Sequence, residues 1–168
     1  MKKTLFIGAF ALLTSCTAVQ NSGSDKQPFV WEGANLYFLL TDRFNNGDPN
    51  NDVNFNRTEK TAVLRGFEGG DLRGIIQKID DNYFSDLGIN AIWMTPVVEQ
   101  IHGATNEGTG NTYGFHGYWA KDWTELDPNF GTKAELKELV EKAHKKGIRV
   151  VLDAVINHTG PVTAQDAV

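Results

Sequence analysis

An aspartate, an asparagine and a histidine follow an apolar run close to the end of the 168-residue sequence. The run 148–152 leads into Asp153, and Asn157 and His158 come a few residues later. At the mouth of a buried strand, Asp153 can accept hydrogen bonds or orient a base, Asn157 can offer an oxygen to a cation, and His158 can donate to a substrate oxygen. Each residue alone would usually be structural, but the three together indicate a site.

A second group of oxygen-bearing side chains follows the apolar run 35–40 and surrounds Gly47 and Pro49. Its members are Asp42, Asn45, Asn46, Asp48, Asn50, Asn51 and Asp52. Closely spaced carboxylate and amide oxygens suit Ca²⁺, which takes roughly six to eight oxygen ligands in flexible geometry. An Asx-rich turn that bonds its own backbone accounts for the same composition. The spacing is not that of an EF-hand, and composition does not separate the two interpretations.

Aromatic and imidazole rings gather among glycines between positions 113 and 123. They are Tyr113, Phe115, His116, Tyr118, Trp119 and Trp123. Flat ring faces suit the apolar C–H patches of sugars, and a histidine can donate to sugar hydroxyls. A cluster that only packs this loop onto the domain would show the same residues. The segment is therefore a candidate sugar site with a structural alternative.

The elements around these residues alternate between strand and helix. Short apolar runs at 35–40, 89–94 and 148–153 predict buried strands. Apolar residues at helical spacing predict helices over 71–87 and 132–146, with Thr132 as N-cap and Gly88 and Gly147 as C-terminal stops. This order predicts an α/β fold made of right-handed parallel β-α-β units.

Two architectures use such units, the doubly wound sheet and the (β/α)8 TIM barrel. A doubly wound nucleotide-binding domain should have a GxGxxG turn after its first strand, where this sequence reads TDRFNNGDPNND. Long loops rich in Asp, Asn, Gly and aromatic residues follow the strand ends, as in barrel active sites. The sequence therefore predicts the N-terminal portion of a TIM barrel, about three β/α units, over 31–168.

Composition limits the classes of partner. The formal net charge of -5 and the isoelectric point near 5.3 provide no basic surface for nucleic acid. A single cysteine excludes an internal disulfide framework. With 40% hydrophobic and 22% charged residues, the chain has the composition of an ordinary globular domain.

That cysteine stands at the end of an export signal. Residues 1–16 begin with two lysines, continue with a short apolar stretch and end in LTSC. The last four residues resemble the bacterial lipoprotein box, which implies lipidation of Cys16 and an exported protein anchored in the cell envelope, in the periplasm or at the outer membrane or cell surface. A plain secretory signal is the alternative. Residues 17–30 are polar and predict a flexible linker.

Several of these motifs together resemble the α-amylase family of glycoside hydrolases. DAVINH is similar to the first signature region of that family, GFHGYWAKDW to its substrate-stacking loop, and the segment 69–97 to its first helix and second strand. The similarity covers residues 36–161. It implies a TIM barrel that acts on α-1,4-glucans with a retaining mechanism.

The resemblance also implies roles for single residues. His116, Tyr118 and His158 would line the subsite of the sugar under attack, with Tyr118 stacked on the ring, Trp119 behind it and Asp153 as a buried orienter. Asn157 would bind the main calcium ion. A second calcium ion would be held by Asn46, Asp48, Asn51, Asp52, Gly69 and Asp71.

One part of the family pattern is missing from the printed sequence. Retaining glycosidases need a nucleophile and an acid/base about 5 Å apart, and the family carries them after later strands. No residue after His158 matches either one. We therefore expect a truncated barrel that is inactive on its own. A transglycosylase of the same family that forms cyclodextrins, or a non-catalytic surface module that binds glucans, remains an alternative.

Overall fold

The computed structural model describes residues 28–167. The predicted signal 1–16, its Cys16 and most of the predicted linker 17–30 lie outside these residues. The compact unit that carries the predicted site is Trp31–Val168. Within the described range, no helix is long and apolar enough to cross a membrane.

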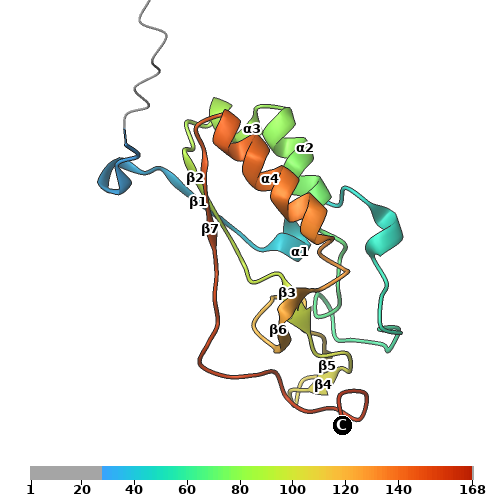
Figure 1. Ribbon diagram of the computed structural model, residues 1–168. Coiled ribbons are helices and arrows are strands. Elements are labelled where there is room, and N and C mark those ends of the chain that lie inside the picture. Colours follow the sequence, from blue (N-terminus) through green and yellow to red (C-terminus); the bar gives the residue numbers. More distant parts are fainter. Residues whose placement is uncertain (1–27, 168) are drawn as a thin grey trace, which may run out of the picture. The chain divides into compact units, whose positions relative to one another are not determined.

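Three parallel strands form the central sheet of this unit. They are β1 (Leu36–Leu39), β2 (Ala91–Met94) and β7 (Arg149–Leu152), in the spatial order β1-β2-β7. The register aligns Leu39, Met94 and Leu152, so the carboxyl ends of all three strands lie at one edge. The predicted parallel β/α units are confirmed, and the described residues form a partial α/β barrel that is not closed (Figure 1).

The helices lie along one face of this sheet (Figure 1). The main ones are α2 (Leu72–Asp80), α3 (Tyr83–Asp86) and α4 (Lys133–Lys145). The start of α4 is the predicted one: Thr132 accepts from the Glu135 backbone N–H, and the Glu135 carboxylate accepts from the Thr132 backbone N–H. Three further helices are only three or four residues long: η1 (Trp31–Gly33), α1 (Thr41–Phe44) and η2 (Pro49–Asn51).

The prediction of one helix over 71–87 was wrong, because the chain breaks between α2 and α3. Asn82 takes a left-handed backbone conformation with φ 64°. Asp and Asn favour such breaks, since their short polar side chains compete for backbone groups. The Lys146 ammonium then binds the carbonyls of Ile79 and Asp80 at the end of α2.

The sequence suggested a long loop between β2 and α4, but this segment contains four short strands. It contains β3 (Val98–Gln100), which pairs antiparallel with β6 (Ala120–Leu126), and β4 (Thr105–Asn106), which pairs with β5 (Asn111–Thr112). These strands lie beyond the carboxyl ends of the central sheet (Figure 1). The sequence of β6 shows no clear alternation of apolar and polar residues, because the strand is mostly polar and exposed.

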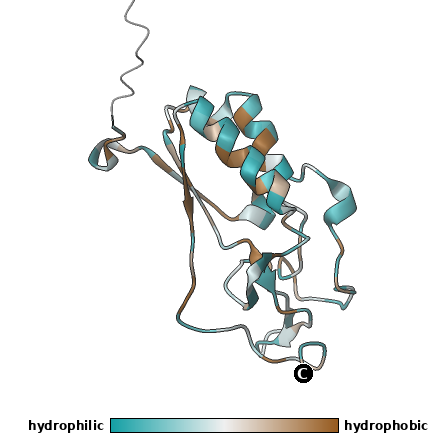
Figure 2. Cartoon of the chain, viewed as in Figure 1, coloured by the Kyte–Doolittle hydropathy of each residue, from teal (hydrophilic) through white to brown (hydrophobic). Residues whose placement is uncertain are grey.

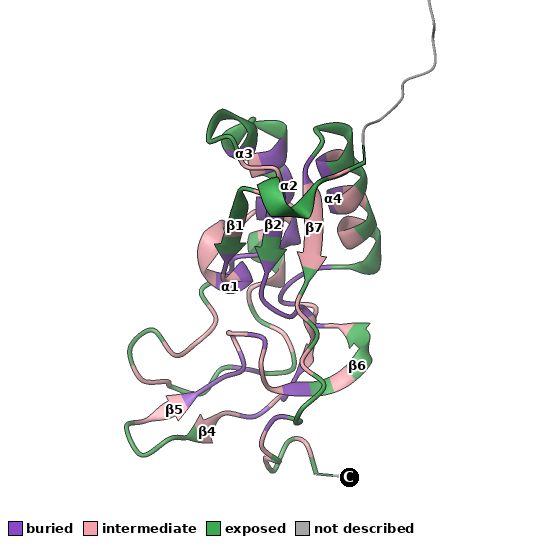
Figure 3. Ribbon diagram, turned by 90° about the vertical axis from the view of Figure 1, so that its left-hand side faces the viewer, coloured by how far each residue is buried: buried purple, intermediate pink, exposed green. Residues whose placement is uncertain are grey.

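The hydrophobic core lies between the sheet and the helices. Figure 2 shows the hydrophobic strands beside helices of mixed character, and Figure 3 shows buried residues along α2, α4 and β2. Its fully buried side chains are Leu72, Ile75, Ile76, Ile79, Phe84, Ile92, Met94, Phe130, Leu139 and Ile148. Burial of one such aliphatic side chain stabilises the fold by about 2 kcal/mol.

The opposite face of the sheet is only partly covered. Leu36 and Phe38 are each 47% exposed and Trp93 is 36% exposed, and the Phe38 and Trp93 rings meet edge to face at 5.1 Å. The apolar runs have the pattern of strands buried on both faces, whereas in the described residues this face is left half covered. Exposed apolar patches of this kind promote association.

We predict that the 168-residue chain binds a hydrophobic dye at this face. The Leu36→Ser/Phe38→Ser double variant should lower dye fluorescence by about half, because it removes two half-exposed apolar side chains. Leu87→Ser, at an exposed position next to α3, is the control and should change little. Equal effects of the two variants would show that the dye does not bind at the sheet face.

Candidate functional site

The carboxyl ends of the three parallel strands bring together residues that are far apart in sequence. Asp42 follows β1, Thr95 follows β2 and Asp153 follows β7. The Thr41 backbone N–H donates to Thr95 Oγ1 at 3.1 Å, so the first two loops are tied at this edge. The predicted site therefore lies where side chains at the C-terminal edge of parallel strands usually act.

Asp153 is the centre of a small hydrogen-bonded group. Its Oδ2 accepts from the Tyr118 hydroxyl at 3.0 Å and from the Trp93 indole N–H at 3.3 Å. Burial, and next the bond to Asp153, raise the pKa of Tyr118 above its usual value. The tyrosine therefore stays a neutral donor that fixes both its own ring and the carboxylate.

The expectation that Asp153 is buried was wrong. Asp153 is partly exposed, because it follows β7, a strand at the open edge of the sheet. The carboxylate is oriented by two donors rather than enclosed by apolar side chains. The structure places Asp153 beside Tyr118, with more access to solvent than expected.

His116, Tyr118 and Trp119 form a continuous aromatic wall. The His116 and Tyr118 rings are nearly parallel, at 19° and 5.9 Å between centroids, and Trp119 meets His116 edge to face at 4.8 Å. Gly117 takes φ 86° between them and lies against the Pro96 carbonyl, a conformation and a space that only glycine fits. We call these three residues the aromatic wall.

The protonation of His116 follows from its contacts. The Tyr118 backbone N–H donates to His116 Nδ1 at 3.0 Å, so the proton of the neutral imidazole is placed on Nε2. Burial lowers the pKa of His116, which also favours the neutral ring. His116 can therefore offer an Nε2–H donor near neutral pH.

His158 and Asn157 lie in the exposed segment after β7. The Nε2 atom of His158 is 3.2 Å from the Tyr118 carbonyl, and its Nδ1 is 3.2 Å from Asn157 Nδ2. The His158 proton is thus directed to the Tyr118 backbone rather than to open space. Trp123 Nε1 donates to the Val155 carbonyl at 2.8 Å and holds the same segment from β6.

The predicted second calcium site is organised around Asp71, the N-cap of α2. Its Oδ1 accepts from the backbone N–H groups of Gly47 and Gly74, and its Oδ2 accepts from Asp48 N and Asn51 Nδ2. Three of these four donors are backbone N–H groups, so side chains of this segment do bond its own backbone, as the interpretation as an Asx-rich turn required.

One side-chain oxygen of the same loop nevertheless has no hydrogen-bond partner. Asn51 Oδ1 is buried and has no hydrogen-bond partner, which is costly unless a ligand satisfies the atom. A methyl group built on Gly69, whose φ is 91°, would come within 2.3 Å of Asn46 Nδ2 and 2.5 Å of Asp52 Oδ1. Asn46 Nδ2 donates to Asp52 Oδ1 at 2.8 Å, so these two side chains lie together and are joined by a hydrogen bond.

The donor set is therefore compatible with a hard cation that prefers amide and carboxylate oxygens. Among the described residues, no group of three His, Cys, Asp or Glu side chains gathers for a metal ion. Half of the expected ligands are neutral: Asn46, Asn51 and Gly69 would offer amide or carbonyl oxygens, and Asp48, Asp52 and Asp71 would offer carboxylate oxygens.

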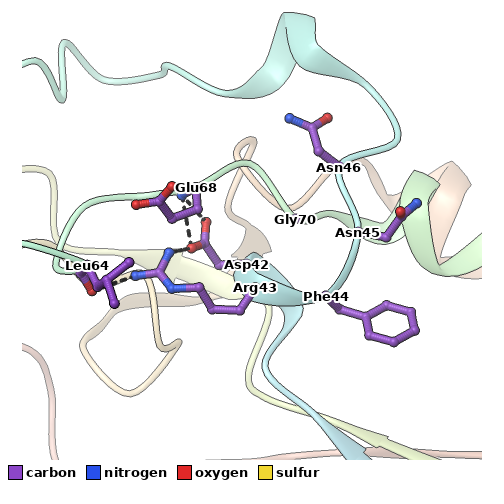
Figure 4. Close-up of a pocket in the computed structure, with 8 residues that line it drawn as sticks. All are labelled: Asp42, Arg43, Phe44, Asn45, Asn46, Leu64, Glu68 and Gly70. Atoms are coloured by element: carbon purple, nitrogen blue, oxygen red, sulfur yellow. Dashed lines mark hydrogen bonds and ion pairs between the residues drawn. The ribbon is translucent and has the colours of Figure 1, made fainter.

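Asp42 and Arg43 line an open pocket of about 430 Å³ at the end of β1 (Figure 4). Asp42 is 1% exposed, pairs with Arg43 and accepts from the Glu68 N–H at 3.0 Å. Arg43 also donates to the Leu64 carbonyl and stacks on Phe115, 3.9 Å from its ring centre. It thereby joins the first strand end to the loop of the aromatic wall.

A buried ion pair below the site was not predicted. Arg57 and Asp127 are 2.7 Å apart, and their side chains are 1% and 0% exposed. The second guanidinium nitrogen binds Asn129 Oδ1 at 2.5 Å. A lone arginine in a polar loop, 70 residues from its partner, gives no periodic or local signal that sequence reasoning could have used.

The sequence is similar to a group of known proteins. A family profile described as alpha amylase, catalytic domain, matches residues 38–166. A periplasmic alpha-amylase of Escherichia coli (strain K12) is 48% identical over 143 residues, covering 83% of this chain and 21% of that protein. A cyclomaltodextrin glucanotransferase of Niallia circulans is 44% identical over 152 residues, covering 89% and 20%.

A solved structure has a similar fold. The crystal structure of an Anoxybacillus alpha-amylase superposes with a TM-score of 0.65 at 39% identity, covering 79% of this chain and 26% of that chain. The present chain thus spans about a fifth of the length of the two curated relatives.

We predict that Asp42 titrates near neutrality. Burial raises its pKa to about 6 against the opposing effects of the Glu68 N–H and of Arg43. Since the folded pKa lies above the ordinary value near 3.8, the stability that depends on the protonated form is complete below about pH 3.8 and is lost as the pH rises through about 6.

Carboxyl ¹³C NMR checks this prediction, with Asp42→Asn to assign the resonance. A midpoint near pH 6 is expected for Asp42. A midpoint below pH 4 would mean that the Arg43 pair and the backbone donors outweigh burial.

Proposed function

Because the chain belongs to the alpha-amylase catalytic-domain family, we propose that the protein binds and cleaves α-1,4-linked glucans. The aromatic wall at the carboxyl ends of the strands supports this proposal most directly. Ring faces at 19° and 5.9 Å, with Asp153 fixing the Tyr118 hydroxyl, provide a preformed surface for a sugar ring.

In the proposed complex, the glucan ring stacks on Tyr118. His116 donates from Nε2 to a sugar hydroxyl, since its Nδ1 is already occupied by the Tyr118 N–H. Asp153 keeps the Tyr118 ring in place and offers its remaining acceptor capacity toward the ligand. Trp119 supports the wall from behind, against the edge of His116.

The reaction proposed for the protein is retaining hydrolysis, in which a carboxylate attacks the anomeric carbon and a second carboxyl group protonates the leaving oxygen. No residue of the printed sequence is assigned to either role. For these 168 residues alone, we therefore propose sugar binding without turnover.

Transglycosylation is the second candidate for the protein. It is supported by the 44% identity to a cyclomaltodextrin glucanotransferase, which exceeds the level of a merely shared fold. The two reactions share the first half of the retaining mechanism and differ in whether water or a sugar hydroxyl accepts the glycosyl group. A non-catalytic surface module that binds glucans would show the binding and neither product.

Ca²⁺ is proposed as the bound ion of the loop between β1 and α2. The residues that would hold it are Asn46, Asp48, Asn51, Asp52, Gly69 and Asp71, and Asn157 would serve a separate ion. The orphaned Asn51 Oδ1 supports the first assignment. Bound there, the ion would stabilise the loop and the start of α2 rather than take part in bond cleavage.

Export is proposed for the protein, since the residues 1–16 have the pattern of a signal and a relative is described as periplasmic. The finer proposal is a lipid anchor at Cys16, which would attach the protein to the cell envelope. Mass spectrometry of the mature N-terminus, with or without a diacylglyceryl cysteine, decides between an anchored and a freely secreted form.

Tyr118→Ala should weaken maltoheptaose binding about tenfold, because it removes the stacking surface and frees Asp153; this corresponds to roughly 1.4 kcal/mol. Isothermal titration calorimetry measures the change. Tyr83→Ala, which removes an exposed tyrosine on α3, is the matched control and should leave affinity unchanged. A Tyr118→Ala variant with full affinity would place the glucan elsewhere.

Saturating Ca²⁺ should raise the melting temperature of the protein, because a ligand that binds only the folded state stabilises it. Asn51→Leu should remove this increase, while Asn106→Leu, on the exposed β4, should keep it. A melting temperature that does not respond to Ca²⁺ in metal-free protein would remove the calcium proposal and leave the loop as a self-bonded turn.

A further inference from the structure

A neutral side chain, Gln100, links the aromatic wall to the buried interior. It is fully buried at the end of β3. Its Oε1 accepts from the Trp119 backbone N–H at 2.7 Å, and its Nε2 donates to the Val98 carbonyl at 2.8 Å. Both ends of the carboxamide are therefore satisfied inside the protein, so its orientation is fixed.

The bond to Trp119 holds the peptide group that joins two residues of the aromatic wall. The Trp119 N–H belongs to the peptide that joins Tyr118 to Trp119. The same short stretch also has the Tyr118 N–H directed to His116 Nδ1 and the Tyr118 carbonyl directed to His158. Rotation of that peptide would turn the Tyr118 ring away from Asp153 and separate the stacked His116 and Tyr118 rings.

Gln100 is itself held in place by packing and by a buried charge. Its backbone N–H donates to Asp127 Oδ2 at 2.9 Å, and Asp127 is paired with Arg57. Gly114 lies directly against its side chain, since a methyl group built there would be 2.9 Å from Gln100 Cβ. The carboxamide therefore has little freedom to follow a shift of the wall, and it imposes its own position on Trp119.

We propose that Gln100 is a positioning residue for the aromatic wall, whose buried carboxamide sets the peptide between Tyr118 and Trp119 and thereby the ring faces offered to a glucan. It does not touch the substrate and acts through Trp119. The identity of the ligand depends on the proposed function, whereas the geometric role stands on the hydrogen bonds alone.

A substitution at Gln100 and a control substitution at Gln165 test this role in the full-length protein. Gln100→Met keeps the volume and leaves the Trp119 N–H without an acceptor, so maltoheptaose binding should weaken about tenfold at all pH values. Gln165→Met makes the same chemical change at an exposed position and is the matched control. Affinity is measured per folded molecule by calorimetry.

Gln100→Glu provides a pH-dependent rescue. A protonated glutamic acid can accept from Trp119 and donate to Val98, as the glutamine does, whereas the carboxylate cannot donate. Burial beside Asp127 raises the pKa of the introduced carboxyl, while Arg57 opposes that shift. Both forms accept from the Trp119 N–H, so binding should approach the native value at low pH. As the pH rises through that pKa, the Val98 carbonyl repels the carboxylate, and binding should fall by clearly less than in Gln100→Met. The half-buried His116 titrates in both proteins, so the native protein is measured in parallel.

Protection of the Trp119 amide against hydrogen exchange gives a readout that needs no glucan. It should be high in the native protein, be lost in Gln100→Met and return in Gln100→Glu at low pH. If Gln100→Met leaves Trp119 protection and glucan affinity unchanged and lowers only the melting temperature, Gln100 is merely structural and the proposal is overturned. If native protein binds no maltoheptaose while protection follows the expected pattern, the glucan function fails and the positioning role stands.

Discussion

The buried pair of Arg57 and Asp127 connects the end of β3, which carries Gln100, with Asn129 and the loop between β1 and α2. Asp127 accepts from the backbone of Gln100 and of Asn129, and Arg57 donates to the carbonyls of Gln100 and Ile101. Removing one partner of such a pair leaves an uncompensated buried charge and costs about 3–5 kcal/mol. The Arg57 Nε atom has no hydrogen-bond partner, so the pair is not fully satisfied and depends on its neighbours.

The pair acts in two directions. Toward the loop between β1 and α2, Asn129 Nδ2 donates to the carbonyls of Asn51 and Asp52, which fixes the backbone of the proposed calcium ligands. Toward the aromatic wall, Gln100 passes the constraint to Trp119. The parallel sheet supplies the remaining support, because Trp93 and Asp153 stand at its carboxyl edge. One rigid interior thus aligns a loop of oxygen ligands and a surface of rings.

Local chemistry accounts for what the sequence predicted. The three apolar runs, the N-cap Thr132 and the alternation of strand and helix depend on neighbours within a few residues, and all were found. The helix over 71–87 failed because Asn82 prefers a left-handed turn, which outweighs the apolar spacing. The polar strand β6 was missed because its pairing with β3, not its composition, makes it a strand.

The site shows the same division. Tyr118 and Asp153 were expected together, and their 3.0 Å bond brings them together across 35 residues. The degree of exposure of Asp153 could not be read from its strand, since it depends on whether another strand covers that edge. Gln100, Arg57 and Asp127 carry no motif, because their roles arise from contacts between segments 19 to 70 residues apart that only the folded chain reveals.

The proposed glucan surface of this protein is the aromatic wall. A crystal structure of the protein with a bound maltooligosaccharide is the decisive test. We expect a sugar ring stacked on Tyr118, with a hydroxyl within hydrogen-bond distance of His116 Nε2 and the Tyr118–Asp153 bond intact. A saccharide bound away from these residues, or stacked on the exposed sheet face at Phe38 and Trp93, would contradict it.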